Sequence, residues 1–165
     1  MRFYIKNKFA SISGKSFVTD DRGNNVFEVK GNALSLRRKK RIYDMSGNLR
    51  YAVKNKLLHL FGKSAFIIDA NGEKIIKMKD KLLSTEYDIE TSTGDIITVQ
   101  GVLFQGIVHI SKNGREIGNF TIDVTMGSLF AKQDSYVLEV YNREDVALLV
   151  AFVIAYDNIH DAYRD

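Results

Sequence analysis

An uninterrupted apolar run lies near the end of the chain: Val146-Ala147-Leu148-Leu149-Val150-Ala151-Phe152-Val153-Ile154-Ala155-Tyr156. As a helix these eleven residues would rise about 16 Å, whereas the hydrocarbon core of a bilayer is about 30 Å thick. As a buried strand the run would be unusually long, and its alanines favour a helix. A helix that is apolar on every face must be surrounded by protein on every face. The run therefore predicts a short helix threaded through the middle of the fold.

The residues just before the run carry signals for the start of a helix. Asn142 is a favourable N-cap residue, and Asp145 follows it at the spacing of a capping box. Glu144 and Asp145 place negative charge at the positive end of the helix dipole. We therefore expect the helix to begin just after Asn142.

The composition fits one domain that spans residues 1–165. Cysteine is absent, which excludes disulfides and thiolate-bound metals. The opening residues Met1–Lys6 alternate polar and apolar side chains and lack the apolar core of a signal peptide. Because no segment is long enough to span a bilayer, we expect a cytoplasmic protein, with peripheral contact to a membrane as a further option.

The charge of the chain is unevenly distributed, although the net charge is only +4. Residues 30–81 contain 14 lysines and arginines against 4 acidic residues, whereas residues 134–165 contain 7 acidic and 2 basic residues. Such a division is typical of a protein with one anion-attracting face. Lysine-rich strands that are merely solvated would give the same counts.

Glycine punctuates the rest of the chain at regular intervals. Five stretches share an extended approach, a short polar cluster and a glycine: residues 18–23, 42–47, 67–72, 89–94 and 109–114. Three residues before each glycine lies a side chain that can bond the turn backbone, namely Asp20, Asp44, Asp69, Thr91 and Ser111. The glycines supply the positive φ that tight hairpins need. The pattern therefore predicts five β-hairpins.

Five hairpins provide ten strands, and extended segments at residues 3–5 and 135–141 bring the total to about twelve. An antiparallel meander of that size normally closes into a barrel, whose lumen is too wide for wall side chains to fill. We therefore predict a closed antiparallel β-barrel that encloses the apolar helix. Aromatic residues should line the space between wall and helix: Phe27, Tyr51, Phe66, Phe104, Phe120 and Phe130. An empty, lipocalin-like lumen that holds a ligand is the alternative.

These features resemble the LURP-one-related family, within the Tubby C-terminal-like superfamily. The similarity rests on the opening Tyr4-Ile5-Lys6-Asn7-Lys8, on the Asp-x-x-Gly hairpins with Phe27-Glu28-Val29-Lys30-Gly31 after the first, and on the apolar helix followed by Asp157. The resemblance implies a twelve-stranded β-barrel around a central hydrophobic helix. It also implies lipid binding as a function to test, because Tubby-like relatives bind phosphoinositides through surface basic residues and phospholipid scramblases resemble distant members. No Tubby lipid-binding motif matches this sequence residue by residue.

The sharpest local feature is a run of five cationic residues between Leu36 and Ile42: Arg37, Arg38, Lys39, Lys40 and Arg41. In an extended segment alternate side chains point to opposite faces, so all five cannot face a closed lumen. We therefore place the run on a rim loop or on an edge open to water. Anionic lipid headgroups are the favoured ligand, with Lys54, Lys56 and Lys63 as neighbours. Nucleic acid phosphates and a merely solvated loop are the alternatives.

Metal and nucleic acid sites have weaker support. Asp157, His160 and Asp161 would share one face of a continuing helix and could offer carboxylate and imidazole ligands. A polar helix end that meets water explains them more simply, because a short constellation without further ligands is common by chance. The sequence lacks the common nucleic-acid-binding signatures, and only Tyr43 lies near the cations as a stacking residue. We therefore predict no bound metal and no nucleic acid partner.

Catalytic signatures are also missing from the sequence, which has no cysteine nucleophile, no Gly-x-Ser-x-Gly elbow and no phosphate-binding glycine loop. The recurring hairpin aspartates are turn formers by their position. We expect a non-enzymatic binding module without a cofactor, which contacts an anionic phospholipid or phosphoinositide surface through residues 37–41. The alternatives are a scramblase-like membrane-associated protein, whose apolar helix leaves the barrel, and an interaction scaffold for a protein partner.

Overall fold

The computed structural model of the protein describes residues 1–6, 14–31, 38–57, 62–81, 84–102, 106–123 and 135–162. Within these ranges twelve strands follow one another along the chain, and a helix comes after them. The strands are β1 (Arg2–Lys6), β2 (Lys15–Asp20), β3 (Asn25–Gly31), β4 (Lys40–Asp44), β5 (Leu49–Asn55), β6 (Ser64–Ile68), β7 (Lys74–Asp80), β8 (Glu86–Thr91), β9 (Ile97–Val102), β10 (Ile107–Lys112), β11 (Arg115–Asp123) and β12 (Ser135–Val140). The helix α1 (Val146–Asp161) follows one turn of 3-10 helix, η1 (Arg143–Asp145).

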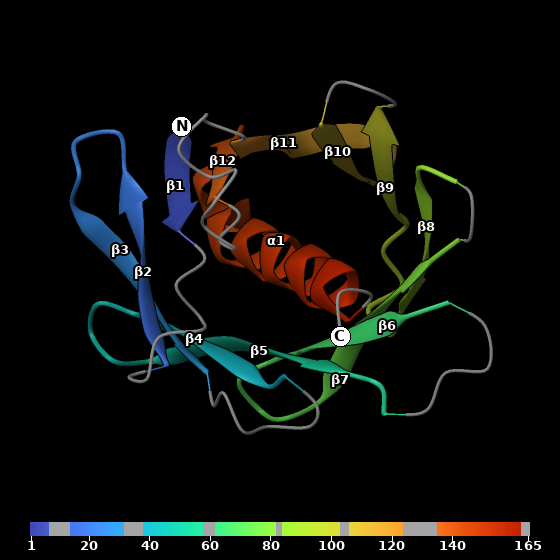
Figure 1. Ribbon diagram of the computed structural model, residues 1–165, viewed down its shortest axis with the longest axis horizontal. Coiled ribbons are helices and arrows are strands. Elements are labelled where there is room, and N and C mark those ends of the chain that lie inside the picture. The colour runs from blue at the N-terminus through green and yellow to red at the C-terminus, as the bar shows by residue number, and fades with distance from the viewer. Residues whose placement is uncertain are drawn as a thin grey trace.

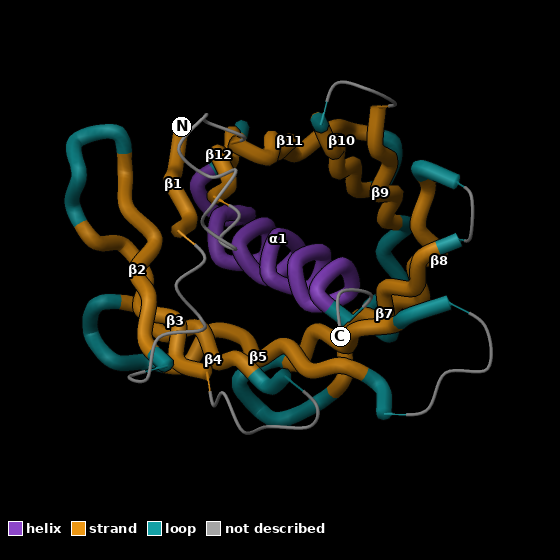
Figure 2. The backbone as a smooth tube through the Cα atoms, viewed as in Figure 1, coloured by secondary structure: helices purple, strands orange, loops and turns teal. Residues whose placement is uncertain are grey.

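Antiparallel pairing between neighbouring strands closes the sheet into a barrel, as Figures 1 and 2 show. β1 pairs with β12 on one side and with β2 on the other, so the sheet is continuous around the ring. Phe3 is opposite Leu138, and Ile5 is opposite Tyr136, so these inward-facing side chains join the core across the closure. The predicted closed, twelve-stranded barrel is confirmed.

The five predicted hairpins are all present, between β2 and β3, β4 and β5, β6 and β7, β8 and β9, and β10 and β11. Each marking glycine has a positive φ, between 78° and 91°. The Asp20 carboxylate accepts hydrogen bonds from the backbone N–H groups of Arg22 and Asn24, at 3.0 and 2.8 Å. The Asp44 and Asp69 carboxylates accept similar hydrogen bonds from backbone N–H groups of their own turns. These aspartates therefore form turns, as their spacing predicts.

The helix α1 lies inside the barrel, with the wall around it (Figures 1 and 2). Its residues 146–155 are all buried except Leu148, which is half-buried. It packs against β5, β6 and β12, and its side chains join the inward-facing strand residues in one hydrophobic core. The central helix that the apolar run predicts is therefore confirmed.

The start of the helix differs from the sequence prediction. The predicted capping box is wrong, because η1 separates Asn142 from α1 and the Asn142 side chain makes no cap hydrogen bond to the backbone. Its amide instead donates to the Asp145 carboxylate at 3.3 Å. At its other end α1 continues beyond Tyr156 to Asp161, which brings further polar side chains into the barrel.

Gly118 of β11 lies close to both the central helix and the neighbouring strand β12. A Cβ atom at this position would lie 2.8 Å from Leu149 Cδ1 and would also clash with the backbone oxygen of Glu139. Real Cβ atoms essentially never come this close to their neighbours, so only glycine fits here without a shift of the helix or of β12. Glycine at this position thus allows β11 to pack closely against β12 and beside Leu149 of α1.

Four of the six aromatic residues that were expected to line the lumen lie within the described ranges. Phe120 is fully buried, and Phe27 and Tyr51 are half-buried against the core. The prediction for Phe66 is wrong, because its two neighbours along β6 are the ones that face the core and Phe66 lies on the outer side of the wall. Phe104 and Phe130 are outside the described residues.

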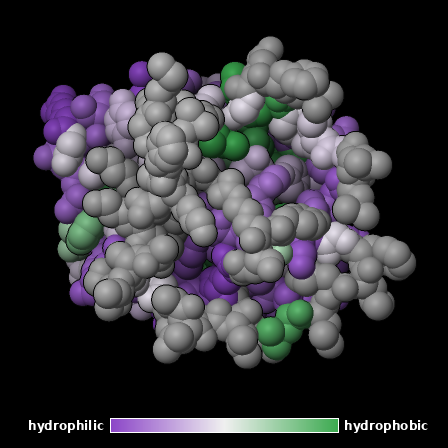
Figure 3. All heavy atoms as spheres, in the orientation of Figure 1, coloured by the Kyte–Doolittle hydropathy of each residue, from purple (hydrophilic) through white to green (hydrophobic). Residues whose placement is uncertain are grey.

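The outside of the barrel is mainly polar. Along β8, exposed Glu86, Asp88 and Glu90 alternate with less exposed residues, as expected for a strand with one face in water. On the face shown in Figure 3, hydrophilic residues lie in the middle and the coloured hydrophobic residues form separate patches. No helix in the described part of the chain is both long and apolar enough to cross a membrane.

Candidate functional site

In strand β4, the side chains of Lys40 and Arg41 point to opposite sides of the barrel wall. Lys40 is opposite Val53 of β5, faces the interior and is only 6% exposed. Arg41 faces outward and is exposed. The expected rim position of the run is therefore wrong for Lys40. The reason is the two-residue repeat of the strand, which places one cation inside whenever the next one is outside.

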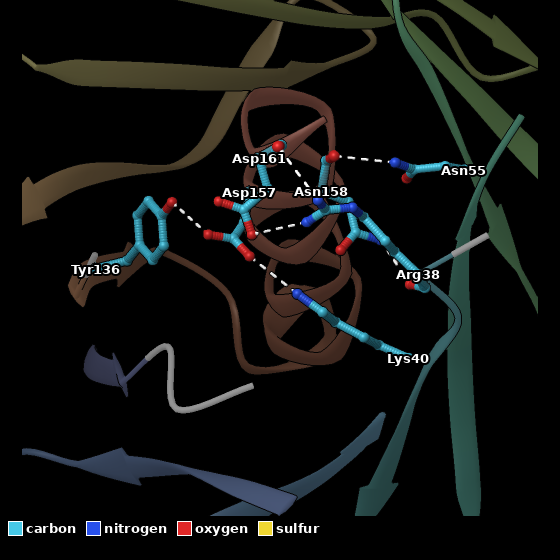
Figure 4. A network of polar contacts seen from close by, with 7 residues as sticks. All are labelled: Arg38, Lys40, Asn55, Tyr136, Asp157, Asn158 and Asp161. Carbon is cyan, nitrogen blue, oxygen red and sulfur yellow. Dashed lines mark hydrogen bonds and ion pairs between the residues drawn. The ribbon is translucent and has the colours of Figure 1, made fainter. Parts of the chain in front are cut away.

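The Lys40 ammonium group meets its counter-ion on the central helix, as Figure 4 shows. Its Nζ atom lies 2.9 Å from Asp157 Oδ2, and the Tyr136 hydroxyl donates to Asp157 Oδ1 at 2.8 Å. Asp157 is 1% exposed, so both charges are removed from water. Burial lowers the pKa of Lys40, and the Asp157 carboxylate opposes this shift. Desolvation offsets much of the attraction in such a pair, so its main effect is to fix the position of the helix end.

Further hydrogen bonds around this pair join α1 to the wall (Figure 4). The Arg38 guanidinium donates to Asp161 Oδ2 at 3.2 Å and to the Asp161 carbonyl at 3.3 Å. The Asn158 side chain donates to the Arg38 carbonyl at 3.0 Å, and the Asn55 side chain donates to the Asn158 carbonyl at 2.9 Å. The residues that make these contacts are called the helix-end network: Arg38, Lys40, Asn55, Tyr136, Asp157, Asn158 and Asp161.

The polar residues of the last helical turns have separate partners. The His160 ring nitrogen Nε2 lies 2.8 Å from the Tyr87 hydroxyl, and the ring centroids of His160 and Tyr156 are 4.1 Å apart. Asp157 and Asp161 are bound to the two cations described above. No group of three or more metal-ligating residues occurs in the parts of the chain that the structure describes. The arrangement suits the anchoring of a helix end to a barrel wall.

The five predicted anion-binding residues thus have different environments. Arg38 and Lys40 belong to the helix-end network, Lys39 is half-buried and Arg41 is exposed. Arg37 lies outside the described residues. Among the predicted neighbours, Lys56 is exposed, and Lys54 and Lys63 are half-buried. Arg41 is therefore the described member of the run that offers an exposed charge to a ligand.

Arg41 continues a row of cations across the outside of the wall. Lys15 of β2 is directly opposite Lys30 of β3, and Lys30 is directly opposite Arg41 of β4. These three residues are called the basic face. The carboxylate of Glu28 lies between two of them, 2.9 Å from Lys30 Nζ and 3.7 Å from Lys15 Nζ. Arg41 has no ion pair with any residue that the structure describes.

The sequence prediction missed Lys15 and Lys30 as partners of Arg41. Each has the local signal of an outward position, because the neighbouring Ser16 and Val29 are buried. The proximity of the three cations comes from the register between three strands, which no local pattern contains.

A pocket of about 810 Å³ lies at the opposite mouth of the barrel, where α1 begins. Phe3, Val146 and Ala147 contribute apolar surface to it. Charged residues of both signs also line it: Arg2, Arg22, Arg50 and Arg143, with Asp20, Asp21, Asp44 and Glu144. Because charged side chains of the two signs are balanced, this pocket has no strong preference for anions.

Similarity to known proteins agrees with this architecture. No curated protein sequence matches the chain. The X-ray structure of a protein from Arabidopsis thaliana has a similar fold, with a TM-score of 0.59 and 16% sequence identity over 99% of this chain and 92% of that chain. At that identity the likeness concerns the fold alone. The LURP-one-related family model matches residues 1–157, from the first strand to the buried aspartate of the helix end, and the protein therefore belongs to the LURP-one-related family.

Proposed function

We propose that the protein is a non-enzymatic binding module that docks onto anionic phospholipid headgroups through the basic face. The observation that carries the proposal is the register of Lys15, Lys30 and Arg41, which lie directly opposite one another on adjacent strands. Like charges in such positions repel each other and cost stability. Glu28 already offsets part of this repulsion through its ion pairs with Lys30 and Lys15, so three cations and one carboxylate leave a net charge of +2. An anionic partner would offset this remaining charge, to which Arg41 contributes without an ion pair among the described residues.

The net charge of the basic face sets the strength of the membrane association to expect. Each lysine or arginine near an anionic membrane contributes about 1 kcal/mol, so the two net charges left after Glu28 contribute about 2 kcal/mol, or roughly thirtyfold in affinity. Exposed charges are screened over about 10 Å at 0.1 M salt, so the binding should weaken as the ionic strength rises. Anionic lipids are concentrated in the cytoplasmic leaflet, and we therefore place the protein in the cytoplasm, at the periphery of the membrane.

The outer wall is favoured over the lumen because α1 occupies the lumen with buried side chains. The helix-end network also disfavours a scramblase-like function in which α1 leaves the barrel. Such a movement would separate Lys40 from Asp157 and Arg38 from Asp161 and leave buried charges without partners.

Flotation with lipid vesicles tests the proposal through a pair of matched variants. Arg41→Glu reverses one charge of the basic face, whereas Arg115→Glu reverses an equally exposed arginine at the start of β11. On vesicles that contain phosphatidylserine, Arg41→Glu changes the charge by two and should lower the affinity by about 2 kcal/mol, or roughly thirtyfold, whereas Arg115→Glu should leave the affinity unchanged. Equal binding of the wild type and Arg41→Glu, or equal binding to phosphatidylcholine and phosphatidylserine vesicles, would overturn the proposal.

A block of alanines over residues 37–41 is unsuitable for this test. It would also remove Lys40 from Asp157 and Arg38 from Asp161, so a loss of binding could not be separated from a loss of folding. A comparison of phosphatidylserine with phosphoinositide vesicles at equal total charge shows whether the headgroup or only the surface charge is recognised.

A further inference from the structure

We propose that Phe17 is an apolar anchor that enters the bilayer interface while the basic face holds the headgroups. The inference rests on the proposed function, and it identifies β2 as the strand whose outer face lies against the membrane. Phe17 lies in β2, two residues after Lys15 of the basic face, and both side chains point outward. Phe17 is 41% exposed, on the outer face of a wall whose inner face is filled.

Two other outward-facing residues extend the apolar surface away from the cations. Tyr4 of β1 is 37% exposed and is directly opposite Thr19, so it lies diagonal to Phe17 within the reach of an aromatic side chain. On its other side Tyr4 is directly opposite Val137 of β12. The outer wall therefore changes from an apolar patch, made of Val137, Tyr4 and Phe17, to the basic face, and β2 contributes to both. Glu28, which is directly opposite Phe17, lies at the boundary, where its charge is offset by Lys30 and Lys15.

Strand β2 joins the apolar patch to the basic face around the ring. The ring order β12, β1, β2, β3, β4 places β2 in the middle. Twelve strands that close a ring turn by about 30° from one strand to the next. When β2 faces a flat bilayer, Tyr4 and Lys30 on the adjacent strands are tilted away only slightly. Arg41 lies one strand farther, where a long side chain still acts within the Debye length of about 10 Å.

This combination matches the chemistry of a membrane interface. Proteins that lie on a bilayer insert apolar side chains about 5–10 Å into the boundary between headgroups and acyl chains and keep cations at the headgroups. Tyrosine is enriched at the same level because its ring is amphipathic. An acidic protein partner could use the same cations and also bury the phenylalanine, so quenching by lipid acyl chains is the measurement that distinguishes a bilayer from a protein.

A fluorescent reporter can test the anchor at one position at a time, because the sequence contains no tryptophan. Phe17→Trp places an indole at the proposed anchor. Ile96→Trp is the matched control, because Ile96 is 70% exposed and lies between β8 and β9, on the far side of the ring from β2. With phosphatidylserine vesicles, Phe17→Trp emission should shift to the blue and be quenched by lipids with brominated acyl chains. Ile96→Trp should show neither effect.

The outcomes separate the anchor from the proposed function. If Phe17→Trp protein floats with the vesicles but its emission is neither shifted nor quenched, the anchor is wrong and the electrostatic contact remains. If the protein does not float, the proposed function fails as well. Phe17→Ala, which leaves the core untouched, should weaken vesicle binding about tenfold at both low and high salt, whereas Ile96→Ala should not. A loss of less than about twofold for Phe17→Ala would also contradict the anchor.

Discussion

Replacing Lys40 by methionine tests whether the buried ion pair holds the helix end in the barrel. Methionine keeps much of the volume of the lysine side chain but carries no charge. Asp157 would keep the hydrogen bond from Tyr136 and lose its cation, while remaining only 1% exposed. Removal of one partner from a buried pair costs about 3–5 kcal/mol, because the other charge stays buried without compensation. For a chain of 165 residues this corresponds to a fall of roughly 10 °C in Tm.

Urea unfolding followed by circular dichroism measures this loss as a lower midpoint with an unchanged m value. A second variant that combines Lys40→Met with Asp157→Asn removes both charges and keeps an acceptor for the Tyr136 hydroxyl. It should recover at least half of the lost stability, because no isolated charge remains buried. Lys79→Met is the control at an outward-facing position of β7, and it should change the stability by less than about 0.5 kcal/mol.

Two results would refute this reasoning. One is a Lys40→Met protein within about 1 kcal/mol of the wild type, which would mean that the pair does not hold the helix end. The other is a double variant that is no more stable than Lys40→Met, which would mean that the loss comes from the changed shape of the side chain and not from the isolated carboxylate.

Gly118→Ala should destabilise the protein by about 1–3 kcal/mol in the same urea assay, because the added Cβ meets the central helix and the neighbouring strand. Gly31→Ala, whose Cβ would have ordinary contact distances, should cost clearly less, and equal losses would contradict the close approach. Hydrogen bonds from nearby asparagines lower the pKa of Asp20 and Asp44, so their stabilisation is complete above the usual aspartate value of 3.8 and is lost as the pH falls through the lowered values. Asp20→Asn with Asp44→Asn should therefore flatten the acid side of the stability–pH curve, and an unchanged slope would show that these carboxylates do not titrate differently on folding.

The hairpins and the central helix were predictable because their signals are local. Each Asp-x-x-Gly cluster closes a turn between two consecutive strands, so the residues that make the turn are also neighbours in the sequence. The run Val146–Tyr156 is apolar on all sides, and that property alone requires a buried position. Closure of the barrel followed from the number of strands.

The polar interior was not predictable, because it depends on register and on distant contacts. Lys40 and Asp157 are 117 positions apart, and a shift of one residue in β4 would exchange the roles of Lys40 and Arg41. The error at Phe66 has the same origin, since residues 65–68 are all apolar and their alternation does not reveal which ones face inward. The basic face is equally non-local, because strand pairing alone brings its members together.

The central claim is that the outer wall around β2 binds the membrane, and it can be tested most directly by measuring which side of the barrel contacts lipid. The chain has no cysteine, so a nitroxide spin label can be attached to one introduced cysteine at a time. Thr19→Cys in β2, Thr121→Cys in β11 and Thr98→Cys in β9 give three outward-facing positions at increasing distance from β2 around the ring.

The measured quantity is the rate at which the nitroxide collides with dissolved oxygen, divided by its rate of collision with a water-soluble relaxant. When phosphatidylserine vesicles are added, this ratio should rise most at position 19, less at position 121, and not at all at position 98. Equal changes at the three positions, or the largest change at Thr98, would contradict the claim that the outer wall around β2 binds the membrane.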